Sequence, residues 1–138
     1  MKTKRRILAG AVPEAPPGTY SNAIAVGRTI YVAGQHAGEP DGTIVGEHDV
    51  HAQATRALEK IQALLAAAGA TMDDVVKLGV FLTDVTTRAQ VGEARRAFFS
   101  GDFPCSTLVG ISALAQPGLL VEIDAIAVRG ASGTKAKT

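Results

Sequence analysis

Residues 75–82 constrain the fold more than any other segment, because they have a strand pattern that is apolar on both faces. The two alternating sets are Val76, Leu78, Val80 and Leu82 on one face, and Val75, Lys77, Gly79 and Phe81 on the other. Only one of these eight side chains is charged. A strand of this kind is usually covered on both sides of its sheet. Both faces of this strand therefore have to be buried, one on each side of the sheet.

Two segments have the periodicity of a helix. Residues 50–68 carry apolar side chains at spacings of three and four over about five turns. Those side chains are Val50, Ala54, Ala57, Leu58, Ile61, Leu64, Leu65 and Ala68. Asp49 suits the N-cap of this helix and Gly69 suits its C-terminal end. A shorter helix is predicted over residues 88–99, with Val91, Ala94 and Phe98 as its apolar stripe.

The other β-rich runs complete a sheet. They lie at residues 6–8, 22–26, 29–33, 106–111 and 119–128. Gly27-Arg28 suits a type II′ turn between the second and third of these strands. The predicted order is β-β-β-α-β-α-β-β, an α/β (α+β) sandwich with a mixed six-stranded sheet and two helices on one face. The second face of the sheet is left as an apolar patch, which predicts an oligomer.

Length and charge exclude several classes of protein. The chain has 138 residues and a net charge of +1, which fits one domain over residues 1–138 and gives no electrostatic basis for binding nucleic acid. We expect a core over about residues 16–129 and flexible tails at 1–5 and 130–138. No apolar stretch is long enough to cross a membrane, and no secretory signal is visible. With a single cysteine, Cys105, the sequence favours a cytoplasmic protein.

Two carboxylates in the last strand are candidates for acid–base chemistry. Glu122 and Asp124 alternate with apolar residues, so they point to the same face, about 7 Å apart. A carboxyl group in apolar surroundings has a raised pKa and can act as a general acid or base. The competing interpretation is a solvated strand face, or salt bridges at an interface.

Four other features carry weaker signals. Cys105 follows a proline and has no base nearby in the sequence, which favours an ordinary thiol over a nucleophile. His48 and His51 have a spacing that allows one metal ion, but no third ligand is evident, so no metal is predicted. His36 follows a strand end and is as readily solvated as ligand-facing. Tyr20 follows a constrained Pro-Gly segment, which either fixes the phenol at a site or packs it.

Several segments together resemble the RidA/YjgF family of reactive-intermediate deaminases. The resemblance covers about residues 16–129, and each motif is weak alone while the ordered set is specific. The segments are Pro17–Ala23, Ile30–Gln35, Ala52–Leu58, Ala67–Ala70, Val75–Lys77, Val80–Asp84, Ala97–Phe99, Phe103-Pro104 and Val121–Ala127. The resemblance implies a chorismate-mutase-like fold and a homotrimer with small-molecule sites in clefts between subunits.

The resemblance also implies site residues, with departures. In family members, the arginine of a Pro-x-Arg segment binds the substrate carboxylate. In this sequence Ser106 follows Pro104-Cys105 and takes the position of that arginine. A helix asparagine of the cleft is replaced by Gly92. A cleft cysteine and a cleft serine are replaced by Leu108 and Ala33.

A lost arginine contact in a desolvated cleft costs about 2–5 kcal/mol. Either the substrate lacks that carboxylate or another base supplies the charge. The second helix offers Arg88, Arg95 and Arg96 for this role.

We therefore predict a small-molecule hydrolase that acts on enamines, imines or related electrophiles, in an arginine-lacking branch of the family. Glu122 and Tyr20 are the predicted catalytic residues, and Gly34, Gly92, Cys105 and Ser106 are the predicted ligand contacts. No cofactor or metal is implied. The main alternative is a non-catalytic ligand-binding trimer on the same scaffold. A ribonuclease role is disfavoured by the near-neutral charge.

Overall fold

The apolar periodicity of residues 50–68 forms the longest helix, as predicted. In the computed structural model, which describes residues 2–133, α1 spans Val50–Ala67. The Asp49 side chain accepts a hydrogen bond from the Ala52 backbone N–H at 3.0 Å, and Gly69 follows the helix with φ 80°. The remaining elements are β1 (Lys4–Arg6), β2 (Ala23–Val26), β3 (Thr29–Gln35), β4 (Val75–Leu82), α2 (Arg88–Arg96), β5 (Cys105–Gly110) and β6 (Val121–Val128), with single 3₁₀ turns at Met72–Asp74 and Val85–Thr87.

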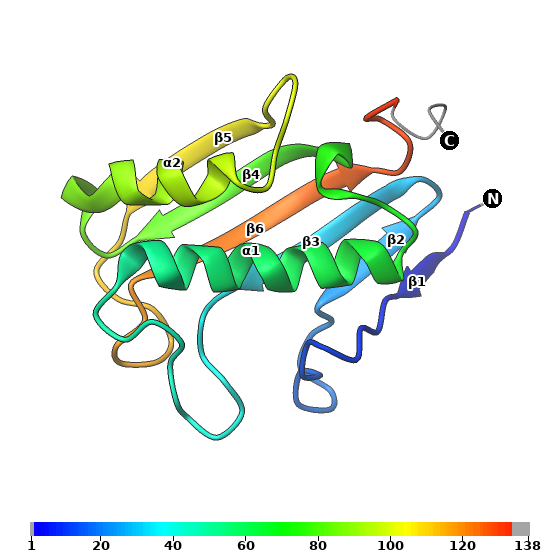
Figure 1. The fold of residues 1–138 in the computed structure, drawn as a ribbon. Coiled ribbons are helices and arrows are strands. Elements are labelled where there is room, and N and C mark those ends of the chain that lie inside the picture. Colours follow the sequence, from blue (N-terminus) through cyan, green and yellow to red (C-terminus); the bar gives the residue numbers. More distant parts are fainter. Residues whose placement is uncertain (1, 134–138) are drawn as a thin grey trace.

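The strands form one mixed six-stranded sheet in the order β1-β2-β3-β6-β4-β5. All neighbouring strands are antiparallel except β4 and β5, which are parallel and are joined through α2. Both helices lie on the same face of this sheet (Figure 1). The predicted fold class and element order are therefore confirmed.

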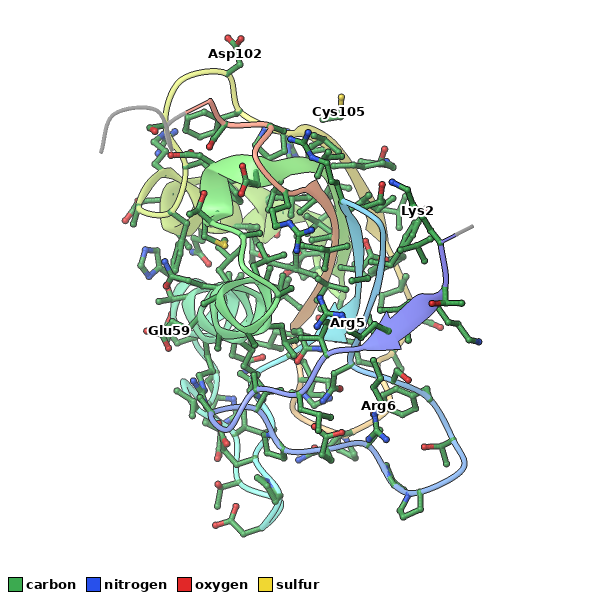
Figure 2. The ribbon with its side chains drawn as sticks, turned by 90° about the vertical axis from the view of Figure 1, so that its right-hand side faces the viewer. Lys2, Arg5, Arg6, Glu59, Asp102 and Cys105 are labelled. Carbon is green, nitrogen blue, oxygen red and sulfur yellow. The ribbon has the colours of Figure 1, made fainter. Side chains whose placement is uncertain are left out.

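The core fills the space between α1 and the sheet. The fully buried side chains of α1 include Leu58, Ile61 and Leu64, and they face fully buried residues of the central strands such as Leu82 and Val121. Figure 2, in which α1 is seen nearly end-on, shows the helices to one side of the sheet. The opposite face, which we call the open face, has no covering layer within the described residues.

A β-bulge changes one detail of the predicted alternation. The pairing of β4 with β6 shifts between Val75 and Lys77, so that Val75 is 5% exposed while Val76 is 40% exposed. The alternating pattern predicted Val76 on the face of Leu78 and Val75 on the opposite face, which is wrong for these two positions. A bulge adds one residue to a strand, and the side chains before it then exchange faces.

The first predicted tail is also partly ordered. Lys4 and Arg5, expected in a flexible segment, form β1 with Arg6 and pair with β2, so the first strand lies at residues 4–6 rather than 6–8. At the other end, the Ser132 backbone N–H donates to Asp74 Oδ1 at 2.9 Å, so residues 130–133 continue the fold. The rest of the predicted C-terminal tail, residues 134–138, lies outside the described residues.

The open face carries a band of apolar side chains. Strand pairing places on it Ile24, Val26, Tyr31, Phe81, Val109, Ile126 and Val128. Tyr31 is 49% exposed and Val109 is 42% exposed. Within the described part of the chain, no helix has the length and hydrophobicity needed to cross a membrane.

Candidate functional site

The open face holds the predicted carboxylate pair at its centre. Glu122 and Asp124 alternate on β6 with the buried residues Val121 and Ile123, so both carboxylates point away from the helices. Their cross-strand neighbours on β4 are Phe81 and Gly79. Neither carboxylate has an ion-pair partner among the described residues. Two uncompensated carboxylates in the middle of an apolar band are typical of a functional site rather than of a solvated strand.

Glycines on the flanking strands make room for both carboxylates. A Cβ atom at Gly34 of β3 would collide with Glu122 Oε2, and a Cβ at Gly79 of β4 would collide with Asp124 Oδ1. Gly34 lies in a β-bulge, because the pairing of β3 with β6 shifts between Val32 and Gln35. At this bulge the backbone of β3 approaches Glu122 so closely that a side chain at position 34 would displace the Glu122 carboxyl group.

The environment of Glu122 favours its protonated form. Burial raises the pKa of the Glu122 carboxyl above its ordinary value, and the neighbouring Asp124 carboxylate raises it further. A carboxylate with a raised pKa is a better proton acceptor near neutral pH than an ordinary surface glutamate. This is the electrostatic arrangement that the sequence interpretation of Glu122 as an acid–base residue requires.

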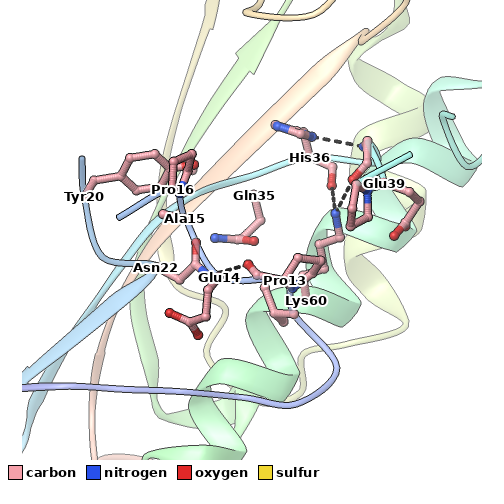
Figure 3. A pocket seen from close by; sticks show the side chains of 14 residues that line it. Pro13, Glu14, Ala15, Pro16, Tyr20, Asn22, Gln35, His36, Glu39 and Lys60 are labelled. Carbon is pink, nitrogen blue, oxygen red and sulfur yellow. Dashed lines mark hydrogen bonds between the residues drawn. The ribbon is translucent and has the colours of Figure 1, made fainter. Parts of the chain in front are cut away.

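Tyr20 lies at a second part of the site, a cavity that Gly34 also lines. The Tyr20 side chain is 60% exposed, and together with Gly34 and His36 it lines a cavity of about 210 Å³ (Figure 3). No hydrogen bond joins Tyr20 to Glu122 among the described residues. The fold therefore brings Gly34 together with Glu122 and with Tyr20, whereas Glu122 does not line the cavity beside Tyr20.

Ser106, predicted as a ligand contact, accepts a hydrogen bond from an arginine of a different element. On β5 it pairs with Leu78, a buried residue of β4, so its side chain points to the helix-covered side. There Arg95 of α2 donates from Nη1 to Ser106 Oγ at 2.9 Å. A Cβ at Gly92, one turn earlier on α2, would meet only Arg95 Nη2, at 3.9 Å. Gly92 therefore leaves open space beside the Arg95 guanidinium.

The other two arginines of this helix region are placed differently. Arg88 donates from Nη1 to the Val85 carbonyl at 3.3 Å, within its own turn. Arg96 is exposed. Cys105 is exposed as well, and its sulfur projects away from the molecule (Figure 2). Of the three candidate arginines, only Arg95 reaches the position of Ser106.

The histidine pair does not build a metal centre. His51 lies 3.6 Å from Glu93 and His48 lies 3.5 Å from Glu47; the His48 side chain is exposed and the His51 side chain is partly buried. In the part of the chain that the structure describes, no group of three or more His, Cys, Asp or Glu side chains is arranged to hold a metal ion.

Sequence reasoning missed Lys60, which is 4% exposed. It lies on α1, and its ammonium donates to the His36 and Gly38 carbonyls at 2.7 Å each. Its spacing of three residues from Ala57 and four from Leu64 was the available signal, because it places a charged residue beside the apolar stripe.

The fold and the site together define a class of protein: a two-layer α+β sandwich whose uncovered sheet face bears a carboxylate pair. The family model described as endoribonuclease L-PSP matches residues 11–129. The chain therefore belongs to this family, which is the RidA/YjgF family.

Individual relatives agree with this assignment. A RutC family protein of Pyrococcus abyssi is 38% identical over 83% of this chain and 89% of its own length. The 2-iminobutanoate/2-iminopropanoate deaminase of Rattus norvegicus is 35% identical over 91% of each chain. Among solved structures, a Pseudomonas aeruginosa protein superposes with a TM-score of 0.83 at 41% identity over 94% of each chain. A Rid family protein of Yersinia pestis also has a TM-score of 0.83, at 37% identity over 91% of this chain and 99% of that one.

Proposed function

We propose that this protein is a homotrimeric hydrolase that deaminates small imines or enamines in clefts between its subunits. The observation that carries the proposal is the seating of Glu122 over Gly34, where burial and Asp124 raise the pKa of its carboxyl group. The similarity to a relative named 2-iminobutanoate/2-iminopropanoate deaminase supports the same reaction class.

Glu122 suits the hydrolytic step of such a reaction. Its carboxylate accepts a proton from a water molecule as the water oxygen bonds to the imine carbon. Glu122 then returns this proton to the nitrogen, which gives a neutral amino alcohol. As the C–N bond breaks, the hydroxyl proton passes to the departing nitrogen, so that ammonia leaves and the carbon becomes a carbonyl group. Proton transfer by a positioned carboxyl contributes about 10²–10⁴-fold to such a rate. Tyr20, which lines a cavity together with Gly34, is proposed to orient the ligand.

A trimer would cover the open face of the sheet, which no helix of the described chain covers. The apolar band on the open face includes Tyr31 and Val109, both well exposed in a single chain. Burial of such a band between copies of the chain is favourable by about 25 cal/mol per Å² of apolar surface. Glu122 lies on the open face, whereas Ser106 lies on the helix-covered side of the edge strand β5. A site that uses both regions has to be completed by a neighbouring subunit.

Arg95 is proposed to take the place of the missing arginine as the group that binds a substrate carboxylate. Its Nη1 is held on Ser106, and it has no carboxylate partner among the described residues. A guanidinium binds a carboxylate through two parallel charge-assisted hydrogen bonds. The chain then lacks the arginine of β5 but retains a guanidinium at the same point of the cleft.

The test is turnover of imino acids that an amino-acid oxidase releases in situ, with ammonia release or the loss of semicarbazone as the readout. The wild type should accelerate hydrolysis, and Glu122→Gln should lose at least a hundredfold in kcat while its trimeric mass is unchanged. Asp124→Asn is the matched control, which should lose far less. Equal activity of the wild type and Glu122→Gln would refute the role of Glu122. No turnover by the wild type on any imine or enamine would favour a non-catalytic ligand-binding trimer.

A further inference from the structure

The cavity beside Tyr20 and Gly34 has an unusually polar base. Three of the side chains that line it are more than nine-tenths buried: Asn22, Gln35 and Lys60, with exposed fractions of 6%, 5% and 4% (Figure 3). We call this cavity the Lys60 pocket. Its wall is completed by the proline-rich segment 12–16 and by the loop 36–40. Its volume of about 210 Å³ lies below the range of about 300–1,000 Å³ that is typical for drug-sized ligands, so it suits a smaller molecule.

Lys60 places one positive charge in this pocket. Two of the three ammonium donors are used by the His36 and Gly38 carbonyls, which leaves one N–H for a ligand. No carboxylate lies within ion-pair distance of Lys60 among the described residues. The two acidic side chains of the lining already have arginine partners, since Glu14 pairs with Arg6 and Glu39 with Arg56.

The other polar groups of the lining also have donors to spare. His36 Nδ1 accepts a hydrogen bond from the Gly38 N–H at 3.0 Å, so the neutral ring carries its proton on Nε2. The side-chain amides of Asn22 and Gln35 each donate one hydrogen, to the Pro13 carbonyl at 2.9 Å and the Ala33 carbonyl at 3.1 Å. Each of these NH₂ groups retains a second hydrogen. The pocket therefore combines several unused donors with one cation that feels the Glu39 carboxylate but has no carboxylate within ion-pair distance among the described residues.

We propose that the Lys60 pocket is a binding site for a small carboxylate ligand. The carboxylate accepts hydrogen bonds from the free N–H of Lys60 and from the amides at the base, and a short aliphatic chain rests on the walls formed by Pro13 and Pro16. The site lies within one chain and shares Tyr20 and Gly34 with the proposed catalytic cleft, but its ligand is held by Lys60 and uses neither Glu122 nor Arg95. Loss of acetate binding in Lys60→Met and loss of turnover in Glu122→Gln therefore test the two proposals separately.

The experiment is an NMR titration of the full-length protein with acetate, against its neutral isostere acetamide, at constant ionic strength with chloride as the balancing anion. Acetate should shift the amide signals of residues 35–38 in a saturable manner, and acetamide should not. Lys60→Met keeps the length of the side chain and removes its charge, and it should weaken acetate binding at least tenfold. Lys4→Met, at an exposed position in β1, should bind as the wild type does.

Two further readouts keep the test decisive. Arg95→Ala should retain acetate binding at residues 35–38. If binding is lost in Arg95→Ala and kept in Lys60→Met, acetate occupies the proposed catalytic cleft and the Lys60 pocket is not the site. If Lys60→Met does not fold, the pKa of His36 in the wild-type protein, measured with and without acetate, tests the proposal instead. A bound anion favours the imidazolium form, so acetate should raise the pKa of His36. An unchanged His36 titration and unchanged amide signals in acetate would overturn the proposal.

Discussion

Replacement of Arg95 by alanine tests the most distinctive feature of the site. Arg95 is half-buried on α2, and its Nη1 lies 2.9 Å from Ser106 Oγ. If this guanidinium binds the substrate carboxylate, Arg95→Ala removes both charge-assisted hydrogen bonds at once. It also removes a basic residue from the last turn of α2, where a positive charge favours the helix dipole.

The two effects differ in size. A charge-assisted contact to a bound carboxylate in a desolvated site is worth about 2–5 kcal/mol. Because Arg95 is only half-buried, the lower half of this range applies, which gives a loss of about 30- to 300-fold in kcat/KM. The helix-dipole term is about 0.3–1 kcal/mol, and it affects stability rather than turnover. Arg96→Ala is the matched control, because it removes the neighbouring charge of the same helix turn.

The assay is the coupled oxidase reaction with imino acids, run beside a neutral imine that has no carboxylate. Arg95→Ala should lose activity on the imino acids alone, and Arg96→Ala should retain it on both. A double variant, Arg95→Ser with Ser106→Arg, should recover much of the activity that Arg95→Ser loses, because it returns the guanidinium to β5. If Arg95→Ala and Arg96→Ala have the same kcat/KM on imino acids, the guanidinium is not the carboxylate-binding group.

Three further outcomes are expected. Gly34→Ala should displace Glu122 and abolish turnover, whereas Gly79→Ala displaces Asp124 and should leave most of the activity; equal losses would contradict the division of roles. Since the pKa of Glu122 is raised on folding, the folded protein binds more protons than the unfolded chain between the ordinary value of 4.5 and the raised value, and stability falls as pH rises through this window. Glu122→Gln should therefore unfold at a higher temperature than the wild type at pH 7 and lose this advantage below about pH 4.5, which thermal melts at equal protein concentration can check. Light scattering should give three times the chain mass of 14.2 kDa, and a monomer would refute the proposed cleft.

Most of the fold could be predicted because periodicity reports burial directly. The apolar stripe of α1 and the alternating pattern of β6 each predict the face that is buried in the structure. The bulges at Val75 and Gly34 could not be predicted, because a register shift leaves the alternating pattern intact on either side. The ordered strand Lys4–Arg6 was missed because three charged residues have no apolar pattern, and it is their pairing with β2 that orders them.

The site was only partly visible in the sequence for a similar reason. Glu122 stands out as a carboxylate in an apolar strand, but its support by Gly34 depends on two strands that are distant in the chain. The contact of Arg95 with Ser106 joins a helix to the next strand, and no spacing rule predicts it. Lys60 resembles an ordinary helix-surface lysine, and its burial is due to the loop that folds over it.

A subunit-mixing experiment tests the central claim most directly, namely that each site takes Glu122 from one subunit and Arg95 from its neighbour. Glu122→Gln and Arg95→Ala proteins are each purified, unfolded together in equal amounts and refolded. In a closed trimer with random assembly, about a quarter of the interfaces pair an intact Glu122 with an intact Arg95. The account predicts about 25% of wild-type activity in the mixture, well above either variant alone. Activity no higher than the average of the two variants, in mixed trimers verified by native mass spectrometry, would contradict it.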